Sequence, residues 1–127
     1  MEISKGALWG GRIMGGLSGV FLALDAVLKL VQPAALVEAT AKSGWPVSSL
    51  TGLGAVLLLS SLLYLFPKTA VLGAILLTGY LGGAVAAHVR AGDGWLQILF
   101  PAFFGALVWG GLWLRDPRIR ALIPIEK

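Results

Sequence analysis

Hydrophobic residues fall into four long runs, at positions 8–31, 47–66, 69–89 and 95–114, separated by short polar breaks. Each run is close to the roughly 20 residues that an α-helix needs to cross about 30 Å of hydrocarbon. Backbone N–H and C=O groups cannot stay unpaired in lipid, so such runs form helices. The pattern predicts an all-α integral membrane protein, a single-domain bundle (residues 1–127) of four transmembrane helices.

The breaks between the runs differ in length. Residues 66–69 and 90–94 are short and contain proline, glycine or charged residues, which are typical of tight turns. The first connection, residues 32–46, is longer. Within it, residues 33–42 begin with proline, which suits a first helical turn, and Gly44 follows as a stop signal. We expect a short interfacial helix here.

Composition agrees with a membrane protein and narrows its chemistry. Only 13% of the residues are charged, against about 25% in a typical soluble domain. Cysteine is absent, which excludes disulfides, thiol nucleophiles and iron–sulfur ligation by this chain. With a single histidine as well, we expect no metal site, no covalently bound cofactor and no catalytic residue of a known motif.

The basic residues indicate orientation rather than nucleic-acid binding, although the net charge is +4. Seven lie on the side of the termini, Lys5, Arg12, Lys68, Arg115, Arg118, Arg120 and Lys127, and three lie on the other side, Lys29, Lys42 and Arg90. Positive charge concentrates on the cytoplasmic side of membrane proteins, so we expect cytoplasmic termini in the cell (inner) membrane. The first run is longer than the roughly 7–15 residues of a signal-peptide core, so we expect it to be retained.

Two sets of glycines recur at a spacing of four residues. Gly11, Gly15 and Gly19 form a stripe on the first predicted helix, and Gly79 and Gly83 form another on the third. Small residues allow transmembrane helices to approach closely. Packing within the bundle is the simpler interpretation, and homodimerisation is the alternative.

Two of the ionisable residues within the apolar runs form a predicted pair. A charge at the centre of a bilayer costs at least roughly 2.5–3.5 kcal/mol, so such residues are functional candidates. Asp25 and Lys29 are four positions apart and share a helical face. They either neutralise each other structurally or take part in ligand binding or proton handling.

A third ionisable group lies near the outer end of the third helix. His88 shares a face with Tyr80, two turns earlier, and Arg90 follows it. The first and third helices both run outward, which places these residues at the depth of the Asp25–Lys29 pair. The sequence therefore predicts a ligand-binding cluster in the outer half of the bundle. Its members are Asp25, Lys29, Tyr80, His88 and Arg90. A merely interfacial His88 is the alternative.

Several segments resemble the DoxX-like family of small bacterial membrane proteins: residues 63–90, residues 24–30, Phe100-Pro101 and residues 109–116. The resemblance implies a four-helix membrane bundle. The family name derives from a subunit linked to thiosulfate:quinone oxidoreduction, and relatives occur beside redox enzymes. It offers no established catalytic residue to carry over, and it favours a membrane component of a redox system.

Three hypotheses follow. The first is a non-catalytic membrane subunit, or a bundle that binds a quinone or a lipid, with a redox-enzyme partner; the polar cluster would donate hydrogen bonds at the rim of an apolar slot. The second is a small proton-coupled transporter that uses Asp25, although Lys29 would hold this carboxylate ionised and repel cationic substrates. The third is a structural scaffold or assembly factor whose glycine stripes contact partner helices.

Overall fold

The computed structural model describes residues 3–123, which are almost entirely helical and contain no strand. The helices, in chain order, are α1 (Lys5–Val31), α2 (Ala34–Lys42), α3 (Ser49–Leu65), the 3-10 helix η1 (Pro67–Thr69), α4 (Ala70–Ala91), α5 (Trp95–Arg115) and α6 (Pro117–Leu122). The four predicted long helices are confirmed, and each boundary lies within a few residues of the predicted one. The short helix in the first connection is also present as α2, which ends just before Gly44 in the left-handed region at φ 86°.

Three of the helical segments are long and apolar enough to cross a membrane: α1, η1 with α4, and α5. The fourth, α3, is apolar but has only 17 residues, or about 26 Å at a rise of 1.5 Å per residue. Large apolar side chains point outward along these helices, including Leu17 and Leu24 of α1 and Leu59 of α3. Such a surface fits lipid rather than water, so the molecule is a helical membrane bundle.

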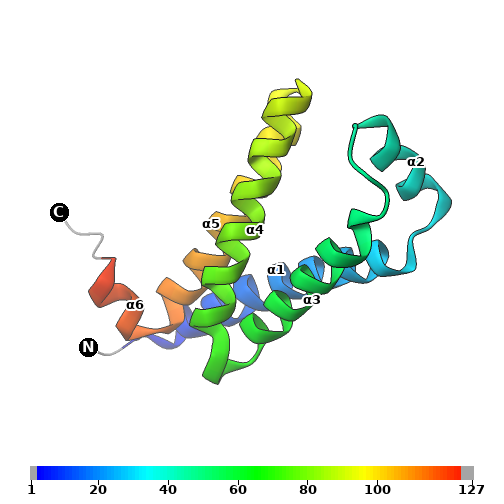
Figure 1. The fold of residues 1–127 in the computed structure, drawn as a ribbon. Helices are drawn as coiled ribbons and strands as arrows, with labels where there is room; N and C mark the ends of the chain where they lie inside the picture. Colours follow the sequence, from blue (N-terminus) through cyan, green and yellow to red (C-terminus); the bar gives the residue numbers. More distant parts are fainter. Residues whose placement is uncertain (1–2, 124–127) are drawn as a thin grey trace.

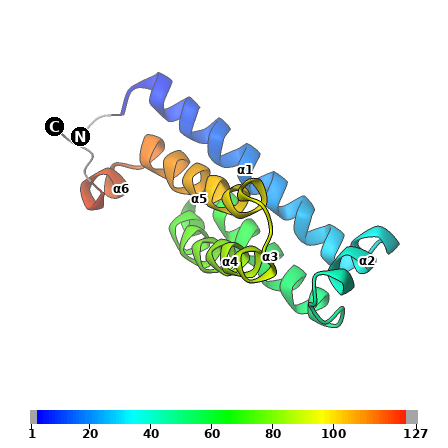
Figure 2. The ribbon, with the colours of Figure 1, turned by 90° about the horizontal axis from the view of Figure 1, so that it is seen from above.

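The four long helices pack in a ring. α1 contacts α3 and α5, and α4 contacts the same two helices from the other side. Figure 1 shows that α1 and α3 form one arm and α4 and α5 the other. The arms meet near η1 and α6 and diverge toward the opposite ends, where α2 lies beyond α1 and α3 (Figure 2). The start of α1 lies at the same end as α6.

Glycine permits the close contact between α1 and α5. Gly11 and Gly15 of α1 and Gly111 of α5 are all buried. A Cβ added at Gly11 would lie 2.6 Å from the carbonyl oxygen of Gly111, and one at Gly111 would lie 2.9 Å from the backbone nitrogen of Gly15. Any side chain at these positions would force the two helices apart. Gly19 packs instead against Leu65 of α3.

Hydrogen bonds of polar side chains join neighbouring helices of the apolar bundle. The buried Tyr64 hydroxyl of α3 donates to the Val108 carbonyl of α5 at 2.7 Å. The Trp109 indole of α5 donates to the Thr78 hydroxyl of α4, also at 2.7 Å. No buried side-chain nitrogen or oxygen in residues 3–123 lacks a hydrogen-bond partner. This satisfies the requirement that a bilayer places on internal polar groups.

Helix α6 was not expected from the sequence. Asp116 forms its N-cap and accepts from the Arg118 backbone N–H at 2.9 Å, and Pro117 occupies the first position. The Arg118 guanidinium donates to the same carboxylate at 2.8 Å. This ion pair holds the pKa of Asp116 below its usual range, although partial burial opposes the shift. Aspartate followed by proline is a typical helix start, so the sequence did contain a signal for α6.

Candidate ligand cavity

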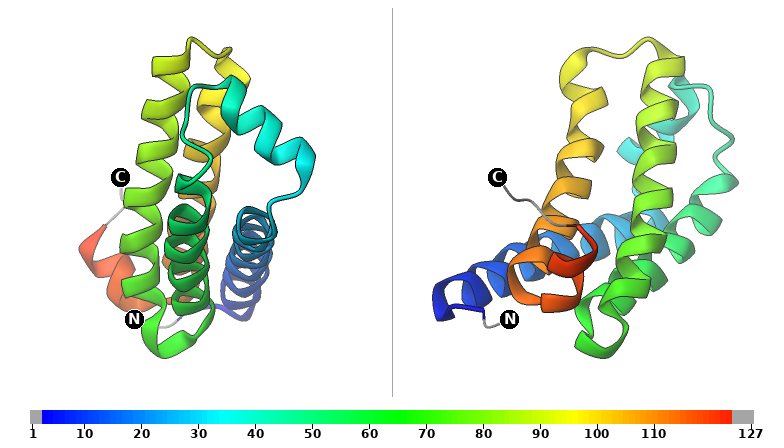
Figure 3. Two further views of the ribbon diagram at one scale, coloured as in Figure 1. Left: turned by 45° about the vertical axis from the view of Figure 1, so that its right-hand side comes forward. Right: turned by 90° about the vertical axis from the view of Figure 1, so that its left-hand side faces the viewer.

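A cavity of about 590 Å³ lies where the two arms diverge. Its walls come from α1, α3, α4 and α5, and α2 with the loop after it covers one side. Figure 3 shows how this loop approaches the end of α4. The volume falls in the range of small-molecule sites, roughly 300–1,000 Å³. We call this space the inter-arm cavity.

The Asp25–Lys29 pair of α1 lines the inter-arm cavity. The Lys29 ammonium donates to the Asp25 carboxylate at 2.8 Å, as the spacing of one helical turn predicts. The Lys29 side chain is only 16% exposed, whereas that of Asp25 is 40% exposed. Tyr80 of α4 lines the same cavity. The structure thus brings three of the predicted residues together across the two arms.

His88 also lines the inter-arm cavity, but its partner was not predicted. Its Nδ1 lies 2.6 Å from the carboxylate of Asp93, in the turn after α4. Gly92, in the left-handed region at φ 73°, turns the chain so that Asp93 folds back on the ring. When Nδ1 carries the proton shared with Asp93, Nε2 of the neutral ring is an acceptor for a ligand hydroxyl. The sequence showed a turn at Gly92, but it did not show that this turn would place Asp93 against His88.

Arg90 does not join this cluster, contrary to expectation. It follows His88 by two positions, which places it on a different side of α4. Its guanidinium carbon lies 5.7 Å from the ring centroid of Trp45, in the loop after α2. Trp45 itself lines the inter-arm cavity. Arg90 therefore joins the end of α4 to the covering loop, and does not face the ligand space.

Aromatic rings form an apolar floor that sequence reasoning missed. Phe21 of α1 stacks on Phe104 of α5, with centroids 4.7 Å apart and planes at 19°. Phe100 meets Phe104 edge to face at 5.1 Å. All three rings line the inter-arm cavity. Phe100 and Phe104 are one turn apart on α5, but only the fold places Phe21 beside them.

The α4 glycines do not pack against another helix of the described bundle, and homodimerisation through them stays a prediction. Gly79 and Gly83 line the inter-arm cavity, and a Cβ at either would meet no atom within 4 Å in residues 3–123. They lie where the arms diverge, so no neighbouring helix of the chain packs on them. They widen the cavity, whereas Gly11, Gly15 and Gly19 of α1 lie at helix contacts.

In residues 3–123, no group of three or more histidine, cysteine, aspartate or glutamate side chains could hold a metal ion. Several side chains that line the inter-arm cavity can themselves contact a ligand. These are an ammonium donor, a phenol donor, a histidine–carboxylate pair and an aromatic surface. Together they can bind a flat or flexible apolar molecule that carries a few hydrogen-bonding oxygens.

Comparison with known proteins places the chain in a family. No curated protein and no solved structure matches it. A sequence model of the DoxX-like family matches residues 13–111, well over half of the chain. The match runs from the third turn of α1 into the last turns of α5, and it contains every residue of the inter-arm cavity named above. The chain therefore belongs to the DoxX-like family.

Proposed function

We propose that this protein binds a lipophilic ligand, a quinone or a lipid, in the inter-arm cavity, and that it serves a redox system as a non-catalytic membrane subunit. One observation carries the proposal. The Asp25–Lys29 pair comes from α1, whereas Tyr80 and the His88–Asp93 pair come from α4 and the turn after it, yet all of them line one cavity with an aromatic floor. Polar groups at the edge of an apolar space are typical of sites for amphiphilic ligands.

A quinone would use both surfaces. Its ring would stack on Phe100 and Phe104, and its carbonyl oxygens would accept hydrogen bonds from Lys29 and Tyr80. A long apolar tail would leave between the diverging arms into the lipid. A phospholipid would place its ester oxygens at the same donors, so both ligand types share one recognition chemistry.

Electrons for a quinone would come from a partner enzyme. The chain has no cysteine and a single histidine, so it offers no redox centre of its own. The seven-to-three distribution of basic residues favours cytoplasmic termini for this chain, and the redox-enzyme partner would lie in the same inner membrane.

The test begins with purified protein from its native membrane. Organic extraction and mass spectrometry should recover a quinone or a phospholipid in near-stoichiometric amount. Titration with a short-chain ubiquinone should then quench tryptophan fluorescence, because Trp45 lines the inter-arm cavity. Tyr80→Phe removes one donor and should weaken binding roughly 2- to 12-fold, the equivalent of about 0.5–1.5 kcal/mol.

Matched variants separate the cavity from the rest of the molecule. Phe100→Leu should weaken binding, whereas Phe103→Leu should not, because Phe103 points outward and does not line the cavity. Asp25→Asn should weaken binding, whereas Glu38→Gln, in the equally spaced but exposed Glu38–Lys42 pair, should not. The proposal would be contradicted if each cavity variant bound the ligand no more weakly than its control, or if no ligand were recovered.

A proton-coupled transporter remains the second candidate, because the Asp25 carboxylate is partly exposed to the inter-arm cavity. It requires proton-driven uptake into vesicles that Asp25→Asn abolishes. The scaffold hypothesis would now rest on the glycines of α4, since those of α1 are occupied by contacts inside the bundle.

A further inference from the structure

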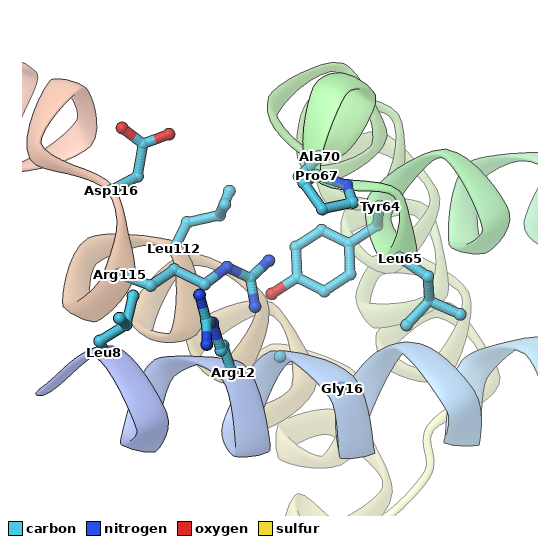
Figure 4. A pocket seen from close by; sticks show the side chains of 11 residues that line it. Leu8, Arg12, Gly16, Tyr64, Leu65, Pro67, Ala70, Leu112, Arg115 and Asp116 are labelled. Atoms are coloured by element: carbon cyan, nitrogen blue, oxygen red, sulfur yellow. The ribbon is translucent and has the colours of Figure 1, made fainter. Parts of the chain in front are cut away.

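A second pocket lies at the opposite end of the bundle, where the start of α1, η1 and the junction of α5 with α6 meet. It has a volume of about 360 Å³. Figure 4 shows that the side chains of Arg12 and Arg115 point into it, together with the hydroxyl end of Tyr64. We call it the two-arginine pocket. None of the residues of the inter-arm cavity lines it.

Arg115 is held in a fixed position in this pocket. Its Nη1 donates to the Gly11 carbonyl at 3.0 Å, and its guanidinium carbon lies 5.2 Å from the centroid of the Tyr64 ring. A Cβ at Gly15 would overlap Nη1, so glycine at this position is what lets the guanidinium pass. The Tyr64 ring is itself fixed by its hydrogen bond to Val108. Such a preorganised guanidinium loses little conformational entropy when it binds a ligand.

Most of the hydrogen-bonding capacity of Arg115 stays available. A guanidinium has five N–H donors, and within residues 3–123 only the bond to Gly11 uses one of them. Arg12 is exposed and stacks on Trp9, with its guanidinium carbon 5.1 Å from the ring centroid. Neither arginine forms an ion pair with a carboxylate of residues 3–123.

The nearest acidic group does not neutralise the pocket. Asp116 borders it, but its carboxylate is bonded to the Arg118 guanidinium at 2.8 and 3.2 Å. Figure 4 shows the Asp116 carboxylate directed away from Arg12 and Arg115. Two positive charges thus share one concave site that is bounded by apolar groups, including Leu8 and Leu112. Such a site attracts an anion with several acceptor oxygens.

We propose that the two-arginine pocket binds a phosphate group, with Arg115 as the fixed ligand and Arg12 as the mobile one. Arginine matches the geometry of phosphate oxygens through paired N–H donors. The phosphate belongs either to a lipid headgroup, whose chains would lie along the exposed apolar residues Ile13 and Leu17 of α1, or to a soluble phosphate ester. This binding site is independent of the inter-arm cavity and of its ligand.

The test measures retention of three probes by the purified full-length protein in native mass spectrometry. The probes are phosphatidylglycerol, phosphatidylcholine and glycerol 3-phosphate. We expect phosphatidylglycerol to bind, with its affinity reduced about tenfold or more in Arg12→Gln, an exposed position that should not disturb folding. Arg115→Lys keeps the charge but loses the paired donors, and it should also weaken binding. Lys5→Gln, at an exposed basic residue of α1 that does not line the pocket, should bind as the wild type does.

Gly16→Glu provides a variant that leaves both arginines in place. Gly16 lines the two-arginine pocket, and a Cβ there meets no atom within 4 Å in residues 3–123. The added carboxylate should neutralise the site and reduce phosphatidylglycerol binding. Binding of glycerol 3-phosphate alone, with loss in the same variants, would assign the pocket to a soluble phosphate ester. Equal losses in Arg12→Gln and Lys5→Gln, or no loss in Gly16→Glu, would overturn the proposal.

Discussion

Glycine-to-alanine substitutions, which add a single methyl group, distinguish glycines at a helix–helix contact from glycines with open space beside them. Gly11→Ala and Gly111→Ala place a Cβ at the contact between α1 and α5, whereas Gly79→Ala and Gly82→Ala place one in open space. The chemical change is the same at all four positions. Only the surroundings differ, so the comparison tests the packing of the bundle directly.

The magnitude follows from the distances. The new Cβ at Gly11 would lie 2.6 Å from the Gly111 carbonyl oxygen, and the one at Gly111 would lie 2.9 Å from the backbone nitrogen of Gly15. Both neighbours are backbone atoms that cannot rotate away, so the helices must separate. Overpacking of this kind costs about 1–3 kcal/mol. The same substitution in an unobstructed helix instead stabilises by roughly 0.5–1 kcal/mol.

The expected difference between the two groups is therefore roughly 1.5–4 kcal/mol, which corresponds to roughly 5–20 °C in Tm for a chain of this length. Thermal unfolding of the detergent-solubilised protein, followed by tryptophan fluorescence, measures it. Gly11→Ala and Gly111→Ala should lower Tm, and Gly79→Ala and Gly82→Ala should leave it unchanged or raise it. A Tm for Gly79→Ala as low as that for Gly11→Ala would refute the reasoning. It would instead place the α4 glycines at a helix contact, as in a homodimer.

Three further predictions address the ion pairs and the topology. Asp116→Ala should destabilise α6 by about 0.5–2 kcal/mol through loss of its cap. The pKa of Asp116 is lower in the folded state than in the unfolded state. The stability that the Asp116 carboxylate contributes should therefore be present above about pH 4 and be lost as the pH falls through the lowered pKa of the folded state. A pH titration of Trp113 fluorescence, whose indole donates to the Ile123 carbonyl, reports this, and Asp116→Asn should remove the pH dependence. Lys29→Met alone should lower Tm more than the Asp25→Leu/Lys29→Met double variant, since the single change leaves a partly buried charge without its partner, and the opposite order would contradict a paired state. In this cysteine-free chain, Ala41→Cys should react with an impermeant thiol reagent from outside the cell and Leu122→Cys only after lysis, and the reverse pattern would invert the proposed orientation.

Much of the fold was readable from local patterns. The apolar runs and the Pro67 and Gly92 turns marked α1, α3, α4 and α5, and Pro33 with Gly44 marked α2. These features act within a few residues, so the order of the chain is enough to show them. The Asp25–Lys29 pair was predictable for the same reason, because one helical turn joins its members.

The remaining features depend on how the helices are arranged, which periodicity does not encode. One cavity is lined by four of the predicted residues, Asp25, Lys29, Tyr80 and His88. Arg90 instead packs on the ring of Trp45. The aromatic floor requires Phe21 of α1 to meet Phe104 of α5. The spacing of Gly79 and Gly83 resembled a packing motif, yet the divergence of the two arms leaves both positions facing the cavity.

Leucine substitution at adjacent glycines of α4 tests the proposed ligand site most directly. Gly83 lines the inter-arm cavity, whereas its neighbour Gly82 does not, and neither has an atom of residues 3–123 near its added Cβ. The measurement is the molar ratio of quinone or phospholipid extracted from purified wild type, Gly83→Leu and Gly82→Leu. The account predicts that Gly83→Leu loses the ligand at least tenfold while Gly82→Leu retains it at the wild-type ratio. Equal ligand content in the two variants would contradict it.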